Sequence, residues 1–209
     1  MDYFPPLLAD KMYHITGRAI GNEKLFLHNE NYRFFLQRFE KYISPVADTF
    51  AWALLPNHFH FLIRIKPYPL LLEHYRKIKP HGKEEEDWQP GFVMKRFGNL
   101  LNSYVKSFNK VNNRRGALFI DYMRRLEVVT DAHYTATIFY IHKNPVHHGC
   151  CKKIADWKWS SYKTILSEAP TKIERQSILD WFGGTEKFIE YHSQPVFLKK
   201  AVMVEFEEG

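Results

Sequence analysis

Two histidines separated by one residue, His58 and His60, have the types and spacing of metal ligands. They lie in the run PNHFHFLIRI, whose aromatic and β-branched residues predict a strand over residues 58–65. Side chains alternate along a strand, so both imidazoles face one side and the neighbouring apolar residues face the other. Imidazole is the commonest protein ligand for metals. The chain contains 11 histidines, so the spacing alone is also compatible with two ordinary surface residues.

A tyrosine and an asparagine four residues apart, Tyr140 and Asn144, form a second candidate group. They follow Thr130, which with the next aspartate caps a predicted helix through residue 142 or beyond. Residues four apart share a helical face, which would place a phenol nucleophile beside an amide oxygen able to act as a third metal ligand. Pro145 disfavours a helical Asn144, so this geometry requires a helix that continues, kinked, past the proline. Otherwise Tyr140 packs as an ordinary tyrosine and Asn144 ends the helix.

The elements that position these groups follow from the spacing of apolar residues. Strands are predicted at residues 12–20, 49–55, 58–65 and 118–129, and helices at 29–43 (with Asn29 as its cap), at 92–109 and from 130 onward. The middle strands meet at Pro56-Asn57 and predict an antiparallel hairpin. The order is that of an α+β, ferredoxin-like βαββαβ core with an antiparallel sheet. Two helices would cover one face of the sheet, leaving the histidines on an open face.

The chain is expected to divide at about residue 150. Residues 1–150 would form the catalytic domain with the tyrosine-bearing helix, and residues 66–90 would be a long, partly helical or disordered connection. Residues 151–209 are predicted to form a helical C-terminal extension, packed on the core and ending in an acidic tail.

Composition limits the class of protein. A chain of 209 residues with 45% hydrophobic and 25% charged residues is neither disordered, nor collagen, nor a disulfide miniprotein. The net charge of +7 is concentrated in residues 64–126, which hold 14 basic and six acidic residues. Such a region favours a polyanionic partner such as nucleic acid, although many soluble proteins are mildly basic. The aromatic content of 16% fits either core packing or a surface that stacks bases.

The cellular setting is predicted from simple features. Cys150 and Cys151 are adjacent, which disfavours an unstrained disulfide and suits a reducing compartment. The first residues lack the pattern of a signal peptide, and no stretch approaches the roughly 20 apolar residues of a membrane span. We expect a soluble cytoplasmic protein.

Several motifs together resemble one family. LLPNHFHFLIRI resembles the signature of HUH single-strand endonucleases, where U is a bulky apolar residue, here Phe59. YIHKNPVHHG, followed by DWKWSSY, resembles the REP-associated tyrosine transposases within the single-tyrosine HUH transposases. YHITGRAIGNEKLF and GALFIDYMRRLEV also match that pattern, so the resemblance covers roughly residues 12–165.

The resemblance implies a ferredoxin-like enzyme that cleaves single-stranded DNA at hairpin-bearing ends such as REP elements. Matched position by position, Tyr140 falls on the nucleophile that forms a 5′-phosphotyrosine, His58 and His60 on the metal ligands, and Asn144 on the third ligand. The implied cofactor is Mg²⁺ or Mn²⁺, the imidazoles making Mn²⁺ competent as well. Attack would leave a free 3′-OH, and a second 3′-OH could rejoin the strands without hydrolysis.

DNA contacts are expected from basic and aromatic side chains. Candidates for phosphate contact, each of which is also explicable as a solvated charge, are Arg18, Lys95, Arg96, Lys106, Arg114 and Arg115. Candidates for base stacking are Trp88, Tyr122 and Trp159, with packing favoured for Trp159. His142 occupies a variable position of the motif. It could act as an added base or a DNA contact, but we favour an ordinary residue on the helix surface.

Three functions from different classes remain open at this point. The first is a metal-dependent strand transferase, favoured by the intact set of four site residues. The second is a domesticated relative that binds hairpin DNA with little or no catalysis. The third is an unrelated phosphoesterase built on the two histidines. The sequence leaves open whether the protein acts as a monomer or a homodimer.

Overall fold

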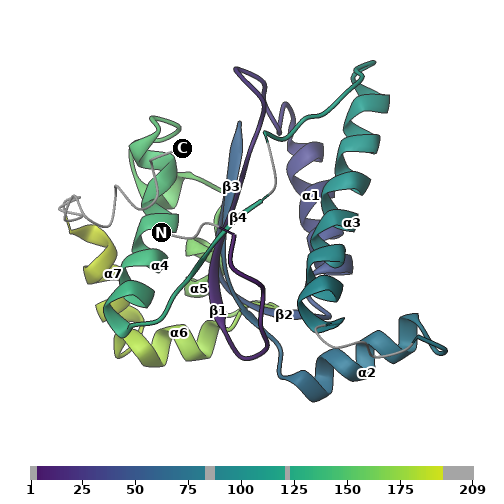
Figure 1. Ribbon diagram of the computed structural model, residues 1–209. Coiled ribbons are helices and arrows are strands. Elements are labelled where there is room, and N and C mark those ends of the chain that lie inside the picture. Colours follow the sequence, from purple (N-terminus) through teal and green to yellow (C-terminus); the bar gives the residue numbers. More distant parts are fainter. Residues whose placement is uncertain (1–3, 83–87, 121–122, 195–209) are drawn as a thin grey trace.

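Four antiparallel strands form the sheet that carries the candidate histidines (Figure 1). The computed structural model describes residues 4–82, 88–120 and 123–194. The strands are β1 (Met12–Arg18), β2 (Ala47–Leu55), β3 (His58–Ile65) and β4 (Arg124–Glu127). Their spatial order is β2-β3-β1-β4, and every neighbouring pair is antiparallel. The order agrees with the predicted βαββαβ connectivity, and the hairpin at Pro56-Asn57 joins β2 to β3 as expected.

Two helices, α1 (Asn29–Tyr42) and α3 (Trp88–Val111), cover one face of the sheet (Figure 1). Phe39 stacks on Phe61 of β3 with ring centroids 4.0 Å apart, and Phe35 lies 5.1 Å from Phe59. These apolar residues of β3 face α1 because side chains alternate along the strand. Much of the aromatic content is therefore core packing.

The opposite face of the sheet is also covered. It carries α4 (Asp131–His147), a 3₁₀ turn (Ile154–Asp156), α5 (Tyr162–Leu166), α6 (Arg175–Phe182) and α7 (Thr185–Ser193) (Figure 1). Phe50 and Leu62 of the sheet belong to one buried cluster with Ile138 of α4 and Phe188 of α7. The expectation of an open face is wrong, because β2 and β3 present apolar side chains here that must be buried.

The last strand and the first helix differ from their predicted limits. The strand expected over residues 118–129 is reduced to the four residues of β4, and Phe119 contributes only an isolated bridge to Ala19. The N-cap of α1 is His28, not Asn29. The cap geometry is set by Asn31, whose Oδ1 accepts a hydrogen bond of 2.9 Å from the backbone N–H of His28.

The connection between β3 and α3 contains a helix, α2 (Tyr68–Ile78). Trp88 at the start of α3 packs against Tyr75 of α2 and donates its indole N–H to the Tyr68 hydroxyl at 3.2 Å. The segment is thus partly helical, as predicted, and held to α3 by aromatic contacts. No helix in the described part of the chain is long and apolar enough to span a bilayer, and both cysteines are free.

Candidate active site

The strand β3 and the helix α4 bring the four candidate residues together. His58 Nε2 lies 2.8 Å from Asn144 Oδ1. The His60 ring meets the Tyr140 ring edge-on, with centroids 5.5 Å apart, and the two histidine rings are 5.0 Å apart. Residues 80 or more positions apart in the sequence therefore line one buried site. Their role in catalysis stays a prediction.

The geometry depends on α4 continuing through Pro145. The helix starts at the predicted cap, where the Thr130 side chain accepts from the backbone N–H of His133 at 3.2 Å. It runs on to His147, so Tyr140 and Asn144 share a face as the i,i+4 spacing requires. Proline has no N–H to donate, but the helix is held by contacts of its buried side chains with the sheet.

The electrostatic environment keeps the imidazoles neutral. Burial lowers the pKa of His58 to about 4, and burial together with the neighbouring histidines lowers the pKa of His60 well below its usual value. The exposed fractions are 9% for His58 and 4% for His60. A neutral imidazole has one N–H and one lone pair, which is the form that binds a metal ion.

The polar atoms around His58 do not satisfy one another fully. Its Nδ1 lies 2.8 Å from Asn57 Oδ1 and its Nε2 lies 2.8 Å from Asn144 Oδ1. A neutral ring has a single N–H, so with the amides in this orientation one of the two contacts brings two lone pairs together, while Asn144 Nδ2 is buried without a hydrogen-bond partner among the described residues. His60 Nε2 is buried as well, with no hydrogen-bond partner among the residues the structure describes.

These observations fit a divalent cation. A cation between His58 Nε2, His60 Nε2 and Asn144 Oδ1 would satisfy both the opposed lone pairs and the unpartnered nitrogen. Over residues 4–82, 88–120 and 123–194, no three His, Cys, Asp or Glu side chains converge as ligands. A third ligand from the protein would therefore be the Asn144 amide oxygen.

A third histidine, His14 of β1, belongs to the same site and was missed in the sequence. Its Nε2 lies 3.0 Å from His60 Nδ1, and its ring stacks on the His60 ring with centroids 5.1 Å apart. It also meets Tyr140 edge-on at 6.0 Å. The signal was present: β1 lies beside β3 in a ferredoxin-like sheet, and strand alternation allows His14 to share the face of His60.

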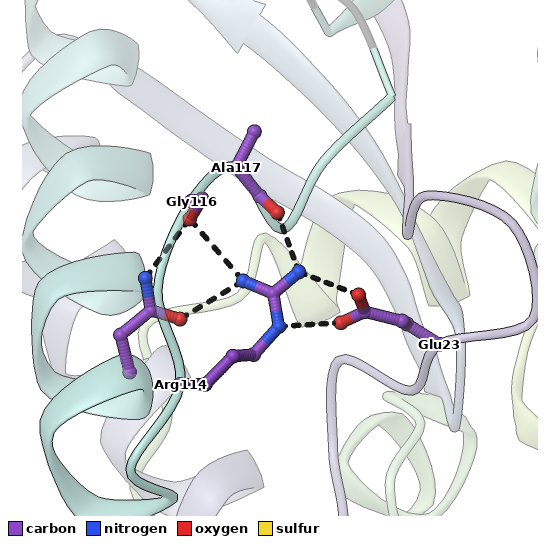
Figure 2. Close-up of polar contacts among 5 residues, drawn as sticks. Glu23, Arg114, Gly116 and Ala117 are labelled. Carbon is purple, nitrogen blue, oxygen red and sulfur yellow. Dashed lines mark hydrogen bonds and ion pairs between the residues drawn. The ribbon is translucent and has the colours of Figure 1, made fainter.

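Arg114, one of the candidate phosphate contacts, is occupied by contacts within the protein (Figure 2). Its Nε and Nη2 donate to the two carboxylate oxygens of Glu23, each at 2.6 Å. The remaining donors reach Asn109 Oδ1 and the carbonyls of Gly116 and Ala117. All five N–H groups of the guanidinium are thereby used. The ion pair holds the pKa of the Glu23 carboxyl below its usual value.

Arg96 has a similar structural use. Its guanidinium donates to the backbone carbonyls of Lys41 and Tyr42, at 3.2 Å and 3.1 Å. These are carbonyls at the C-terminal end of α1, where a cation is favoured by the helix dipole. Arg96 therefore links α3 to the end of α1.

Four candidate cations are exposed and form no ion pair within the described part of the chain: Arg18, Lys95, Lys106 and Arg115. Arg18 ends β1 directly opposite His58 in the strand register. Lys95 and Lys106 are on α3, in the helical layer on the other side of the sheet from α4 (Figure 1). Arg18 is thus the candidate best placed for a phosphate at the histidines.

The remaining candidates are mostly packed. Trp159 stacks on Tyr32 with centroids 4.6 Å apart, in agreement with the preferred interpretation. Tyr122 lies outside the described residues. His142 is fully buried rather than on the helix surface. Its Nδ1 lies 2.9 Å from His192 Nε2 of α7, and its Nε2 lies 2.8 Å from Ser161 Oγ, so it joins α4 to the C-terminal extension.

Comparison with known proteins supports the fold. No protein-family model matches the chain, and no curated protein matches its sequence significantly. Among solved structures, the chain is similar to a REP-associated tyrosine transposase bound to a REP hairpin, with a TM-score of 0.58 and 15% sequence identity. The match covers 82% of this chain and 90% of that one. At this identity the likeness confirms the fold that the motifs implied.

Proposed function

We propose that the protein is a metal-dependent endonuclease and strand transferase that acts on single-stranded DNA carrying hairpins, such as REP elements. The observation that supports this most directly is the convergence of Tyr140, two neutral histidines and Asn144 in one buried site. The solved structure with a similar fold is a tyrosine transposase bound to a REP hairpin, which favours the same substrate class here.

The reaction assigns a task to each side chain. The Tyr140 phenol gives its proton to solvent and attacks the scissile phosphorus, the bond to the 3′ oxygen breaks and that oxygen takes up a proton from solvent, so that a 5′-phosphotyrosine and a free 3′-OH result. His58, His60 and Asn144 would hold a divalent ion, Mg²⁺ or Mn²⁺, which polarises the phosphoryl oxygens when bound. Arg18, opposite His58, would contact the phosphate. One copy of the chain supplies all of these groups.

A covalent-capture gel tests the proposal. The full chain is incubated with labelled hairpin single strand and Mn²⁺, then denatured, and we expect labelled DNA to stay on the protein. Tyr140→Phe should abolish the adduct, whereas Tyr134→Phe, on the same helix, should retain it. An adduct that survives Tyr140→Phe would exclude the proposed nucleophile, and metal-dependent hydrolysis unaffected by that change would indicate a phosphoesterase.

A second candidate function, hairpin binding without cleavage, is favoured by one observation. The Tyr140 side chain is only 3% exposed, so a DNA strand must displace covering groups before it meets the phenol. The same gel distinguishes the two functions. Tight binding of the hairpin with no adduct from the wild-type chain would support the binding protein and exclude the enzyme.

A further inference from the structure

A contact between two histidines on neighbouring strands suggests how the site is prepared for its ion. We propose that His14 is a positioning residue, which accepts the Nδ1–H of His60 and so directs the lone pair of His60 Nε2 into the site. The inference rests on the proposed function, since it concerns the same metal site, but it makes a claim that can be measured without any DNA cleavage.

The geometry holds the two rings in one arrangement. His14 Nε2 and His60 Nδ1 are 3.0 Å apart, and the rings are stacked with an interplanar angle of 18°. The side chains come from adjacent strands, where His60 pairs with Thr16 and His14 pairs with Leu62. They are therefore diagonal neighbours on one face of the sheet, each fixed by its own strand. His14 is 2% exposed, so water does not compete for this hydrogen bond.

The contact allows only two arrangements of protons. Either His60 Nδ1 donates to His14 Nε2, or His14 Nε2 donates to His60 Nδ1. In the second arrangement His60 carries its proton on Nε2, which makes no hydrogen bond of good geometry among the described residues. The polar side chain near it, Asn144, already has its Oδ1 2.8 Å from His58 Nε2. Buried donors without an acceptor are rare in proteins. The first arrangement leaves a lone pair at Nε2 instead, which is what a cation requires.

The need to hold a proton on His60 Nδ1 explains why the neutral His14 lies behind the proposed metal ligand His60. A histidine that binds a metal through Nε2 is commonly held by an acceptor at Nδ1, which fixes its tautomer and orientation. Asn57 Oδ1 occupies that position for His58, at 2.8 Å from Nδ1. His14 Nε2 occupies it for His60. The two ligands are thus supported by different groups, an amide oxygen from the hairpin turn and an imidazole from β1.

The tautomer of His60 can be measured directly. Long-range ¹H–¹⁵N spectra of the metal-free, full chain distinguish Nδ1–H from Nε2–H histidines, and loss of one pattern in His60→Gln assigns the signal. We expect His60 in the Nδ1–H form. Finding His60 as Nε2–H would overturn the inference, whether or not the protein cleaves DNA.

Two substitutions of His14 test the consequence for metal binding. His14→Leu keeps an apolar volume but removes the acceptor, and should weaken Mn²⁺ binding, measured by titration, about 10–100-fold. His14→Gln offers an amide oxygen in reach of His60 Nδ1 and should largely restore the affinity. Equal Mn²⁺ affinity for wild type and a folded His14→Leu would contradict the inference. Normal metal binding and tautomer without a DNA adduct would count against the proposed function alone.

Discussion

The single N–H of His58 lies between two amide oxygens, so one of its two contacts has no hydrogen to share. Asn57 Oδ1 and Asn144 Oδ1 both lie 2.8 Å from the ring, and burial lowers the pKa of His58 to about 4, so the ring stays neutral near pH 7. Opposed lone pairs in a buried site are unfavourable, and a cation between them removes the conflict. We therefore expect metal binding to stabilise the folded protein.

Mn²⁺ should raise the melting temperature of the wild-type protein. At a concentration of about 100 times Kd, linkage gives roughly 2.7 kcal/mol, or a shift of about 5–10 °C for a domain of this size. Asn144→Ala removes one ligand and should reduce the shift, while His81→Ala, an exposed histidine after α2, should keep it. Differential scanning fluorimetry with and without a chelator measures this. An unchanged shift in Asn144→Ala would exclude the amide as a ligand.

The sequence was sufficient to predict the positions of some side chains of the site, and insufficient for others. Spacing alone placed His58 and His60 side by side, and the family resemblance implied that Tyr140 joins them. Burial of His142 did not, because a polar residue in an apolar helix has no distinct signal until its partners, Ser161 and His192, are known. His14 could have been considered, because the predicted strand order puts β1 beside β3, but alternation permits either face until the register of the two strands is known.

At the scale of elements, the turn after α3 is held to the loop before α1 by one side chain. Arg114 binds both oxygens of Glu23 and the carbonyls of Gly116 and Ala117 (Figure 2). Its neighbour Arg115 is exposed. The two adjacent arginines therefore make a matched pair for separating structural from DNA-binding charge. Sequence alone treats them equally, because both are basic residues in a turn.

Arg114→Ala should lower the melting temperature, because it releases the turn from Glu23, while Arg115→Ala should leave it unchanged. In hairpin binding, Arg115→Ala should weaken affinity and reduce the slope of log K against log salt by about 1, as expected for one lost phosphate contact. Thermal melts and binding titrations at several salt concentrations check both. If a stable Arg114→Ala variant instead lost the salt dependence of hairpin binding, Arg114 would be the phosphate contact and Arg115 would not.

The helix α4 is anchored to the C-terminal extension by a buried hydrogen-bond network. His142 contacts His192 of α7 and Ser161 before α5, and Ser161 Oγ accepts from the backbone N–H of Trp52 in β2 at 2.9 Å. The helix that carries Tyr140 is thus tied to the sheet through the extension as well as by direct packing. The fourth strand lies within its predicted range of 118–129 but is shorter, since residues 118–120 pair only irregularly with the end of β1, whereas α4 begins as predicted.

His192→Leu should lower the free energy of unfolding by about 1–3 kcal/mol, because it leaves His142 Nδ1 buried without a partner. His81→Leu, at an exposed position after α2, should change it by less than about 0.5 kcal/mol. Urea denaturation measures both values. Equal stability of the two variants would indicate that the network contributes little.

At the scale of the whole molecule, a sheet covered on both faces buries several histidines in neutral form. Burial lowers the pKa of His14 to about 3 and that of His192 to about 4. In the unfolded chain a histidine binds a proton near pH 6.5. Between about pH 6.5 and 4 the unfolded state thus binds more protons, so the free energy of unfolding falls as pH falls.

At pH 5 each such histidine should cost roughly 2 kcal/mol of stability relative to pH 7 by this linkage. Urea denaturation of the metal-free protein at pH 7, 6 and 5 measures the decline. His192→Leu should show a shallower dependence on pH than wild type, because it removes one of the titrating groups. A wild-type stability that does not change between pH 7 and 5 would show that these side chains are not buried as neutral groups.

Covalent attachment of DNA to Tyr140 can be located by mapping the adduct. After reaction of the full chain with hairpin single strand and Mn²⁺, trypsin should release residues 126–143 as one peptide, which contains Tyr134 and Tyr140. Nuclease treatment and fragmentation by mass spectrometry then locate the residual nucleotide. We predict that it is attached to Tyr140 through a 5′ phosphate. Attachment to Tyr134 or elsewhere, or cleaved DNA with no modified peptide, would exclude Tyr140 as the nucleophile.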